Sequence, residues 1–92
     1  MDIRSTVTIT HWIPILTFCP VNKLPDFIFV EVTFTDTFAE LYGVRSKIRK
    51  LVSKKLMFME DIAKMVADEF PEANAVKVRL MFNKHIVEIR KL

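Results

Sequence analysis

Glycine, cysteine and histidine are scarce in this 92-residue chain, which has one Gly, one Cys and two His. A single glycine excludes a P-loop and a dinucleotide fingerprint, since both need several glycines for close backbone approach to phosphate. One cysteine excludes a disulfide framework, and the lone cysteine with two separated histidines gives no zinc-ligand spacing. No apolar run approaches the roughly 18 residues of a membrane span. The N-terminus has no signal-peptide layout, so the expected location is the cytoplasm, without a membrane partner.

Apolar residues, in contrast, are abundant. They make up 51% of the sequence, with eight Phe. A chain of this length has room for one core, so a single domain over residues 1–92 is predicted. So small a body cannot hide all of this apolar surface, and we expect subunit interfaces to cover the excess. The net charge of +3 is compatible with an RNA partner without requiring one.

Two segments near the N-terminus have the alternation of β-strands. The first spans Ser5 to Leu16, and Pro14 within it favours an edge position or a bulge. The second follows a proline-containing loop over Cys19 to Asp26. In each segment, apolar residues occupy alternate positions and so share one face of the strand. They are Val7, Ile9, Ile13 and Ile15 in the first and Ile28, Val30, Val32 and Phe34 in the second.

Two amphipathic helices are predicted next. The first covers about Phe38 to Lys54, with Asp36 or Thr37 as its cap. The second begins near Phe58 and ends at Pro71. Their apolar stripes are Leu41, Val44, Ile48, Leu51 and Val52 in the first and Ile62, Met65, Val66 and Phe70 in the second.

The last twenty residues predict a hairpin with a two-residue turn at Asn83-Lys84. The register of such a hairpin pairs Leu80 with Val87, Val78 with Ile89, Arg79 with Glu88 and Lys77 with Arg90. The complete order is β-β-α-α-β-β. We therefore expect an α+β sandwich, with a four-stranded antiparallel sheet covered by two helices on one face.

Cys19 is the first candidate for chemistry. A lone cysteine is most often a small buried apolar residue. This one, however, lies where a strand gives way to a loop and precedes Pro20, while Asp26 follows Pro25 at the start of the next strand. If the two strands pair, the loop folds back and brings thiol and carboxylate together. That pair suits a reaction in which sulfur attacks the substrate and the carboxylate moves protons.

The run Cys19-Pro20-Val21-Asn22-Lys23-Leu24-Pro25-Asp26 resembles the C-P-x-[TN]-x-x-P-D segment of the QueF nitrile reductases of queuosine biosynthesis and their QueF-like relatives. Phe58-Met59-Glu60-Asp61 is similar to the F-H-E-D at the start of that family's second helix. Ala39-Glu40-Leu41 lies roughly where the family has a glutamate at the start of its first helix. The element order matches the family's tunnelling fold.

The resemblance implies a role for each matched residue. Cys19 would attack the nitrile carbon of 7-cyano-7-deazaguanine to form a thioimide, and Asp26 would be the general acid/base. Glu60 would accept the adjacent N–H donors of the guanine-like edge, as a carboxylate can do in bidentate fashion. Without the resemblance, Glu60 is an ordinary carboxylate of a first helical turn. The remaining substrate-binding positions that the resemblance implies are Glu40, Leu41, Phe58 and Met59.

Two departures decide between branches of the family. Glu40 to Lys47 does not reproduce the helix with which the reductases bind nicotinamide cofactor, and Met59 replaces the family histidine. The sequence is thus closer to the small QueF-like proteins. The resemblance implies a tRNA-modifying amidinotransferase without cofactor, which adds ammonia to the thioimide and forms archaeosine. The implied assembly is a homo-oligomeric ring, a pentamer or a decamer, with active sites at subunit interfaces. The alternatives are an NADPH-dependent nitrile reductase and a non-catalytic RNA-binding oligomer.

A basic run could serve a tRNA partner. Six cations and no acid fall within eleven residues, namely Arg45, Lys47, Arg49, Lys50, Lys54 and Lys55. A solvated helix face explains such a run as well as phosphate binding does. His11 could help to ionise Cys19 if the first strand curls, whereas His85 is expected to be a surface residue beside the turn. Trp12, Phe18 and Phe58 could enclose a planar base, although core or interface is the commoner role of such aromatics.

Overall fold

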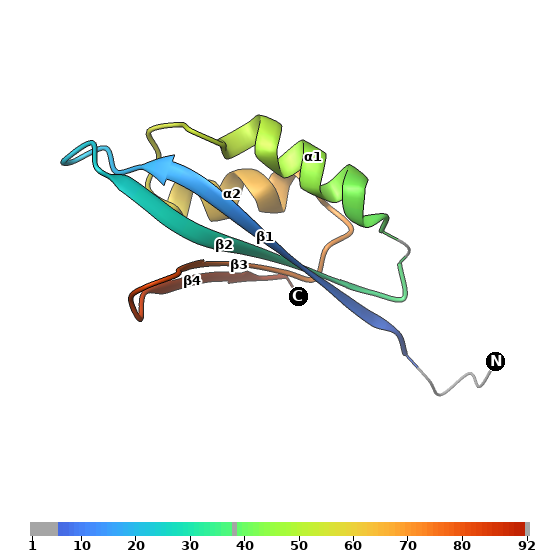
Figure 1. Cartoon of the computed structure of the whole chain (residues 1–92). Helices are drawn as coiled ribbons and strands as arrows, with labels where there is room; N and C mark the ends of the chain where they lie inside the picture. The colour runs from blue at the N-terminus through green and yellow to red at the C-terminus, as the bar shows by residue number, and fades with distance from the viewer. Residues whose placement is uncertain (1–5, 38, 92) are drawn as a thin grey trace.

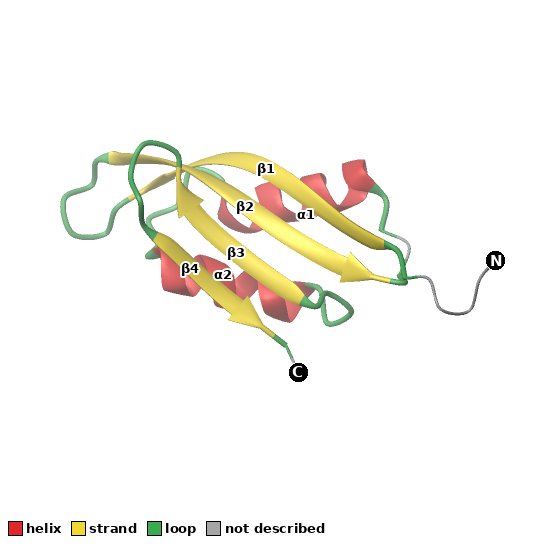
Figure 2. Ribbon diagram, turned by 90° about the horizontal axis from the view of Figure 1, so that it is seen from below, coloured by secondary structure: helices red, strands yellow, loops and turns green. Residues whose placement is uncertain are grey.

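A four-stranded antiparallel sheet lies beneath two helices that cover one of its faces (Figure 1). The computed structural model describes residues 6–37 and 39–91. The elements follow one another as β1 (Thr8–Phe18), β2 (Pro25–Thr35), α1 (Leu41–Val52), α2 (Met59–Glu69), β3 (Ala75–Leu80) and β4 (Ile86–Arg90). The strands are hydrogen-bonded in the order β1-β2-β3-β4, and the other face of the sheet is open (Figure 2). This confirms the predicted α+β architecture and its element order.

The core lies between the sheet and the helices, and the alternation of the strands generates it. On the face of the central strands that meets the helices, six apolar side chains of β2 and β3 are fully buried: Ile28, Val30, Val32, Phe34, Val76 and Val78. Val44, Ile48 and Val52 of α1 and Ile62 and Val66 of α2 pack against them. β1 lies at the edge of the sheet, one of the two positions that Pro14 predicts for this strand. The expected first residue of this strand, Ser5, lies outside the described residues.

The start of α2 agrees with its prediction, but the cap predicted for α1 is wrong. Asp36 has a left-handed backbone with φ of 52°, and its carboxylate accepts from the Val7 amide, so it belongs to the turn after β2. The cap is instead Glu40. The predicted start at Phe38 lies outside the described residues. At the other end the helix stops at Val52, because Ser53 is extended and Lys54 has a φ of 60°.

The hairpin forms, but its predicted turn and register are wrong. The observed pairs are Arg79 with Ile86, Val78 with Val87, Lys77 with Glu88 and Val76 with Ile89. The register is therefore shifted by two residues from the predicted one, which leaves the same side chains on each face. β3 ends at Leu80, and the Leu80 amide donates to the His85 carbonyl over 3.1 Å, which closes the hairpin around the residues between them. Residues 81–85 then form a longer loop in place of a two-residue turn.

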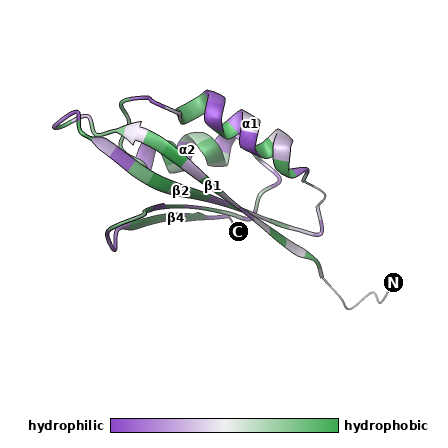
Figure 3. Ribbon diagram, viewed as in Figure 1, coloured by the Kyte–Doolittle hydropathy of each residue, from purple (hydrophilic) through white to green (hydrophobic). Residues whose placement is uncertain are grey.

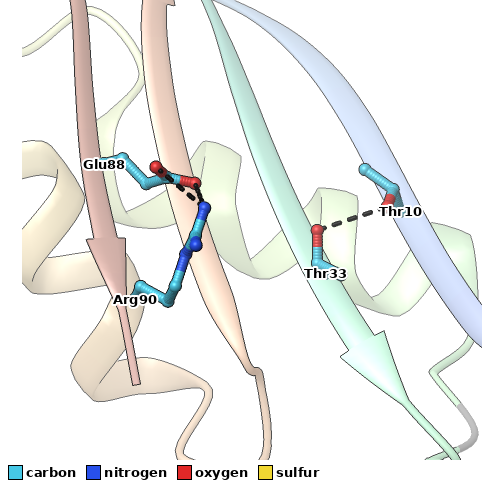
Figure 4. A network of polar contacts seen from close by, with 4 residues as sticks. All are labelled: Thr10, Thr33, Glu88 and Arg90. Carbon is cyan, nitrogen blue, oxygen red and sulfur yellow. Dashed lines mark hydrogen bonds and ion pairs between the residues drawn. The ribbon is translucent and has the colours of Figure 1, made fainter. Parts of the chain in front are cut away.

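The open face of the sheet is amphipathic. The Arg79 guanidinium lies over the Trp12 and Phe29 rings, 4.7 and 5.0 Å from their centroids, and its Nε is 3.7 Å from a Glu31 carboxylate oxygen. Arg79 thus pairs with Glu31 and not with the predicted Glu88. Figure 4 shows the Thr10–Thr33 hydroxyl pair and the Glu88–Arg90 pair farther along the same sheet. No helix of the described residues is long and apolar enough to cross a membrane.

Candidate active site

Cys19 lies in a short loop that is closed by its own hydrogen bonds. The Cys19 amide donates to the Leu24 carbonyl over 3.0 Å, and the Cys19 carbonyl accepts from the Lys23 amide over 2.7 Å. Lys23 takes a left-handed conformation with φ of 61°, and the Asn22 side chain accepts from the Leu24 amide. These bonds give the loop between β1 and β2 a defined shape. The thiol is half-buried and unpaired.

The segment between the helices holds the end of β1 beside the start of α2. The Phe18 amide donates to the Lys55 carbonyl over 2.9 Å, and the Phe18 carbonyl accepts from the Met57 amide over 3.1 Å. Leu56 forms a parallel bridge with Phe18. Because Cys19 directly follows Phe18 and α2 begins two residues after Met57, these contacts bring the thiol to the first turn of α2.

Asp26 faces the same side of the sheet as Cys19. It is the second residue of β2 and lies opposite Thr17 in the register of β1 and β2. Paired residues of an antiparallel sheet project from one face, and Thr17 is fully buried beneath the helices. Cys19 comes two residues after Thr17 and shares its parity. The pairing of the two strands therefore brings thiol and carboxylate together, as the sequence predicts.

One hollow of about 190 Å³ unites these groups with the start of α2. It is lined by Cys19, Pro20, Asp26, Met57, Phe58, Met59, Glu60 and His85. Five of the seven site residues predicted from the sequence thus meet at one end of the molecule. The hollow is smaller than the roughly 300–1,000 Å³ of most ligand pockets, so it suits a single ring system in place of a whole nucleotide.

The side chains at the start of α2 differ in exposure. The Phe58 ring is 46% exposed, whereas Met59 is 8% exposed and belongs to the core. The Glu60 side chain is 57% exposed, so its carboxylate is free to meet a ligand. Phe58 caps the helix without a side-chain hydrogen bond, which leaves first-turn N–H groups for solvent or substrate.

Glu40 and Leu41, also predicted as substrate-binding residues, do not line this hollow. They lie at the start of α1, at the end of the sandwich away from the Cys19 loop (Figure 1). The Glu40 carboxylate accepts from the Tyr42 and Gly43 amides over 2.8 and 2.7 Å. A carboxylate in this position satisfies free helix N–H groups and interacts favourably with the helix dipole. Within one chain, Glu40 therefore acts as a helix cap.

Replacement of Glu40 by alanine is expected to lower stability without weakening ligand binding in the hollow. Loss of a capping side chain costs about 1 kcal/mol. Thermal unfolding of Glu40→Ala measures this loss, and Glu40→Asp is the control because it keeps a carboxylate at the cap. If ligand affinity fell by tenfold or more while stability was unchanged, Glu40 would belong to a binding site and not merely to the cap.

His11 and the other aromatic candidates do not reach the site. His11 is buried within β1 opposite Val32, with its ring edge-to-face against Phe34 at 5.9 Å between centroids, so it does not make the approach to Cys19 that a curled strand would allow. Trp12 lies on the open face of the sheet beside Arg79. Of the three aromatics, Phe58 alone lines the hollow. Over residues 6–37 and 39–91, no group of three His, Cys, Asp or Glu could hold a metal ion.

His85 is the one polar residue of the hollow that the sequence does not indicate. Its Nε2 lies 4.0 Å from Oε1 of Glu60. The expectation of a surface residue is correct for its exposure but misses this position. The sequence signal that could have identified His85 as a site residue is its place in the loop between β3 and β4, since that end of the sheet also carries the Cys19 loop.

Comparison with known proteins gives a match at the level of the fold. No family model and no curated protein sequence matches the chain. Among solved structures, the chain is similar to the apo crystal structure of the archaeosine synthase QueF-like, with a TM-score of 0.61 and 19% sequence identity. The match covers 96% of this chain and 92% of that one. The chain therefore has the fold of the archaeosine synthase QueF-like, which confirms the resemblance inferred from the Cys19–Asp26 and Phe58–Asp61 segments at that level.

Proposed function

We propose that the protein is a tRNA-modifying amidinotransferase that converts the nitrile of 7-cyano-7-deazaguanine in tRNA to the amidine of archaeosine. The observation that carries this proposal is the meeting of Cys19, Asp26 and Glu60 in one hollow of one chain. These are the nucleophile, the proton carrier and the base anchor that the resemblance implies. The fold shared with an archaeosine synthase supports the same assignment.

The reaction has two steps, in which the Cys19 thiol adds to the nitrile and ammonia then replaces the sulfur. The Cys19 sulfur forms a bond to the nitrile carbon, and one π pair of the C≡N bond moves to nitrogen. That nitrogen takes a proton through the Asp26 carboxyl group, so the thiol proton ends on the nitrogen of the thioimide. Ammonia then adds to the thioimide carbon, the C–S bond breaks, and the departing thiolate takes a proton from the added ammonia. The net change is addition of ammonia to a nitrile, which needs no oxidant or reductant.

The substrate would be held by its edge and by its face. The Glu60 carboxylate accepts two adjacent N–H groups of the ring, a charge-assisted and bidentate interaction. The Phe58 ring, at the same first turn of α2, offers a surface on which the base can stack. In this arrangement the residues at the start of α2 bind the substrate, while Cys19 of the loop and Asp26 of β2 carry out the reaction.

The test is product analysis on tRNA that carries 7-cyano-7-deazaguanine, with ammonium present and with NADPH present in separate reactions. The expected result is archaeosine in the ammonium reaction, identified by mass spectrometry of the digested tRNA. An aminomethyl product with NADPH oxidation would show the reductase alternative instead. No product in either reaction, with RNA affinity retained, would favour the non-catalytic RNA-binding alternative.

The surface of α1 offers a place for the tRNA backbone. Four cations and three hydroxyl-bearing side chains line a shallow groove, called here the α1 basic face: Tyr42, Arg45, Ser46, Arg49, Lys50, Ser53 and Lys54. Among the residues that the structure describes, none of these cations forms an ion pair. Hydrophilic stretches mark this helix in Figure 3. Cations without acidic partners suit a phosphate backbone.

The α1 basic face leads toward the hollow. The amide of Lys54, at its C-terminal end, donates to the Leu16 carbonyl over 2.7 Å, three residues before Cys19. Met57 then lines the hollow itself. RNA bound along α1 would therefore have its modified base within reach of the thiol. The Lys47 ammonium instead lies over the Phe70 ring at 5.8 Å, on another side of the helix.

Reversal of charge on the α1 basic face is expected to weaken tRNA binding and leave the hollow intact. For Arg49→Glu combined with Lys50→Glu, the slope of log affinity against log salt should fall by about 1–2, since each phosphate contact contributes about 0.7–0.9. Fluorescence anisotropy at several salt concentrations measures the slope. Lys64→Glu, an exposed reversal on α2, is the matched control. An unchanged slope in the double variant would place the RNA elsewhere.

A further inference from the structure

The loop between β3 and β4 is held at both ends by backbone hydrogen bonds. At its start, the Met81 amide donates over 3.0 Å to the carbonyl of Phe27, the neighbour of Asp26. At its end, the His85 carbonyl accepts from the Leu80 amide over 3.1 Å. His85 therefore has a defined place beside the hollow, although its side chain is 56% exposed.

The imidazole of His85 faces the carboxylate of Glu60. Their nearest atoms, Nε2 and Oε1, are 4.0 Å apart, and the two side chains come from elements far apart in the sequence. A pair with more than half of each side chain in solvent contributes little to stability. A ring that fills the hollow would displace water from between the two groups, and their interaction would then strengthen. The pair is thus better placed to act on a ligand than to hold the fold together.

We propose that His85 is a positioning residue of this site. It donates from Nε2 to one oxygen of Glu60 and turns the carboxylate over the hollow, so that its remaining lone pairs face the N–H donors of a planar heterocycle. This inference rests on the proposed function and adds a specificity device to it. The separation of 4.0 Å exceeds a hydrogen bond by about 1 Å, which a small side-chain rotation closes once the ligand is bound.

The first experiment follows formation of the Cys19 adduct with free 7-cyano-7-deazaguanine as a function of its concentration. His85→Ala is expected to raise the half-saturating concentration about three- to tenfold, as for one lost hydrogen bond, with the maximal rate changed less than about twofold. His85→Gln should restore affinity because its amide nitrogen reaches the position of Nε2. His85→Asn is the shorter matched control and should not.

A double-mutant comparison separates positioning from general damage. In a Glu60→Ala background, His85→Ala should have no further effect, because the carboxylate that it positions is gone. Equal half-saturating concentrations for the wild-type protein and His85→Ala would overturn the inference while leaving the proposed function standing. An additive loss in the double variant would overturn it as well.

A second measurement does not depend on the substrate. Crystal structures of the wild-type protein and of His85→Ala should show the Glu60 carboxylate directed to residue 85 in the first and turned away in the second. If the wild-type protein gave no adduct, the proposed function would fail for the free base, and this comparison would still decide the role of His85. The same Glu60 orientation in both structures would refute positioning.

Discussion

Replacement of Cys19 by alanine is expected to abolish adduct formation with 7-cyano-7-deazaguanine and all amidine production. The reason is chemical, since alanine has no atom that can form the thioimide bond and no other cysteine exists in the chain. Intact-mass spectrometry after incubation with the free base measures the adduct. The mass should rise by the full mass of the base in the wild-type protein, because addition to a nitrile loses no atom.

The Cys19 prediction has a matched control and a clear contradiction. Cys19→Ser keeps the size of the side chain and a proton to donate, but its oxygen is a far weaker nucleophile at neutral pH. We expect no adduct from it either. Both variants should unfold within about 1 kcal/mol of the wild-type protein, since the thiol is half-buried in a loop. An adduct that persisted in Cys19→Ala would place the nucleophile on another residue.

The sheet was predictable because its strands alternate without interruption. Each β2 residue that the pattern assigns to the core, from Ile28 to Phe34, is fully buried. In the hairpin, the pattern has a period of two, so it defines the faces but not the register. The predicted turn at Asn83-Lys84 lacks the glycine that two-residue turns favour, and the Leu80–His85 hydrogen bond closes a longer loop instead.

The start of α1 was less predictable because its cap is unusual. Asp36 and Thr37 are of the residue types that most often cap helices, whereas glutamate is not among them. The Glu40 carboxylate nevertheless reaches two amides of the first turn. Gly43 assists, since a Cβ at that position would lie 3.2 Å from Oε2 of Glu40. The single glycine of the chain thus gives this cap its space.

The candidate site likewise has residues whose proximity could be predicted from the sequence and one whose position could not. Cys19 and Asp26 belong to one hairpin, so local sequence is enough to bring them together. His85 reaches the hollow only through the order of the strands, which places the β3–β4 loop near the start of α2. Met59 stands where the resemblance expects a histidine, and it packs into the core. The imidazole of this site therefore comes from another element, which a motif comparison along the chain cannot find.

Conversion of Asp26 to asparagine is expected to slow adduct formation about 10²- to 10⁴-fold, the usual contribution of a positioned general acid or base. The amide has nearly the shape of the carboxyl group but cannot pass the thiol proton to the nitrile nitrogen. Asp26 is half-buried at the start of β2 and, over the described residues, forms no ion pair, so the fold does not depend on its charge. Single-turnover adduct kinetics at saturating base measure the rate.

Two variants complete the argument about Asp26. Asp61→Asn removes an exposed carboxylate from the same end of the molecule without touching the hollow, so it should react at the wild-type rate. Asp26→Glu keeps the acid on a longer side chain and should fall between the two. If Asp26→Asn stayed within tenfold of the wild-type rate, the proton would come from solvent or from His85. Asp26 would then not be the general acid/base of the hollow.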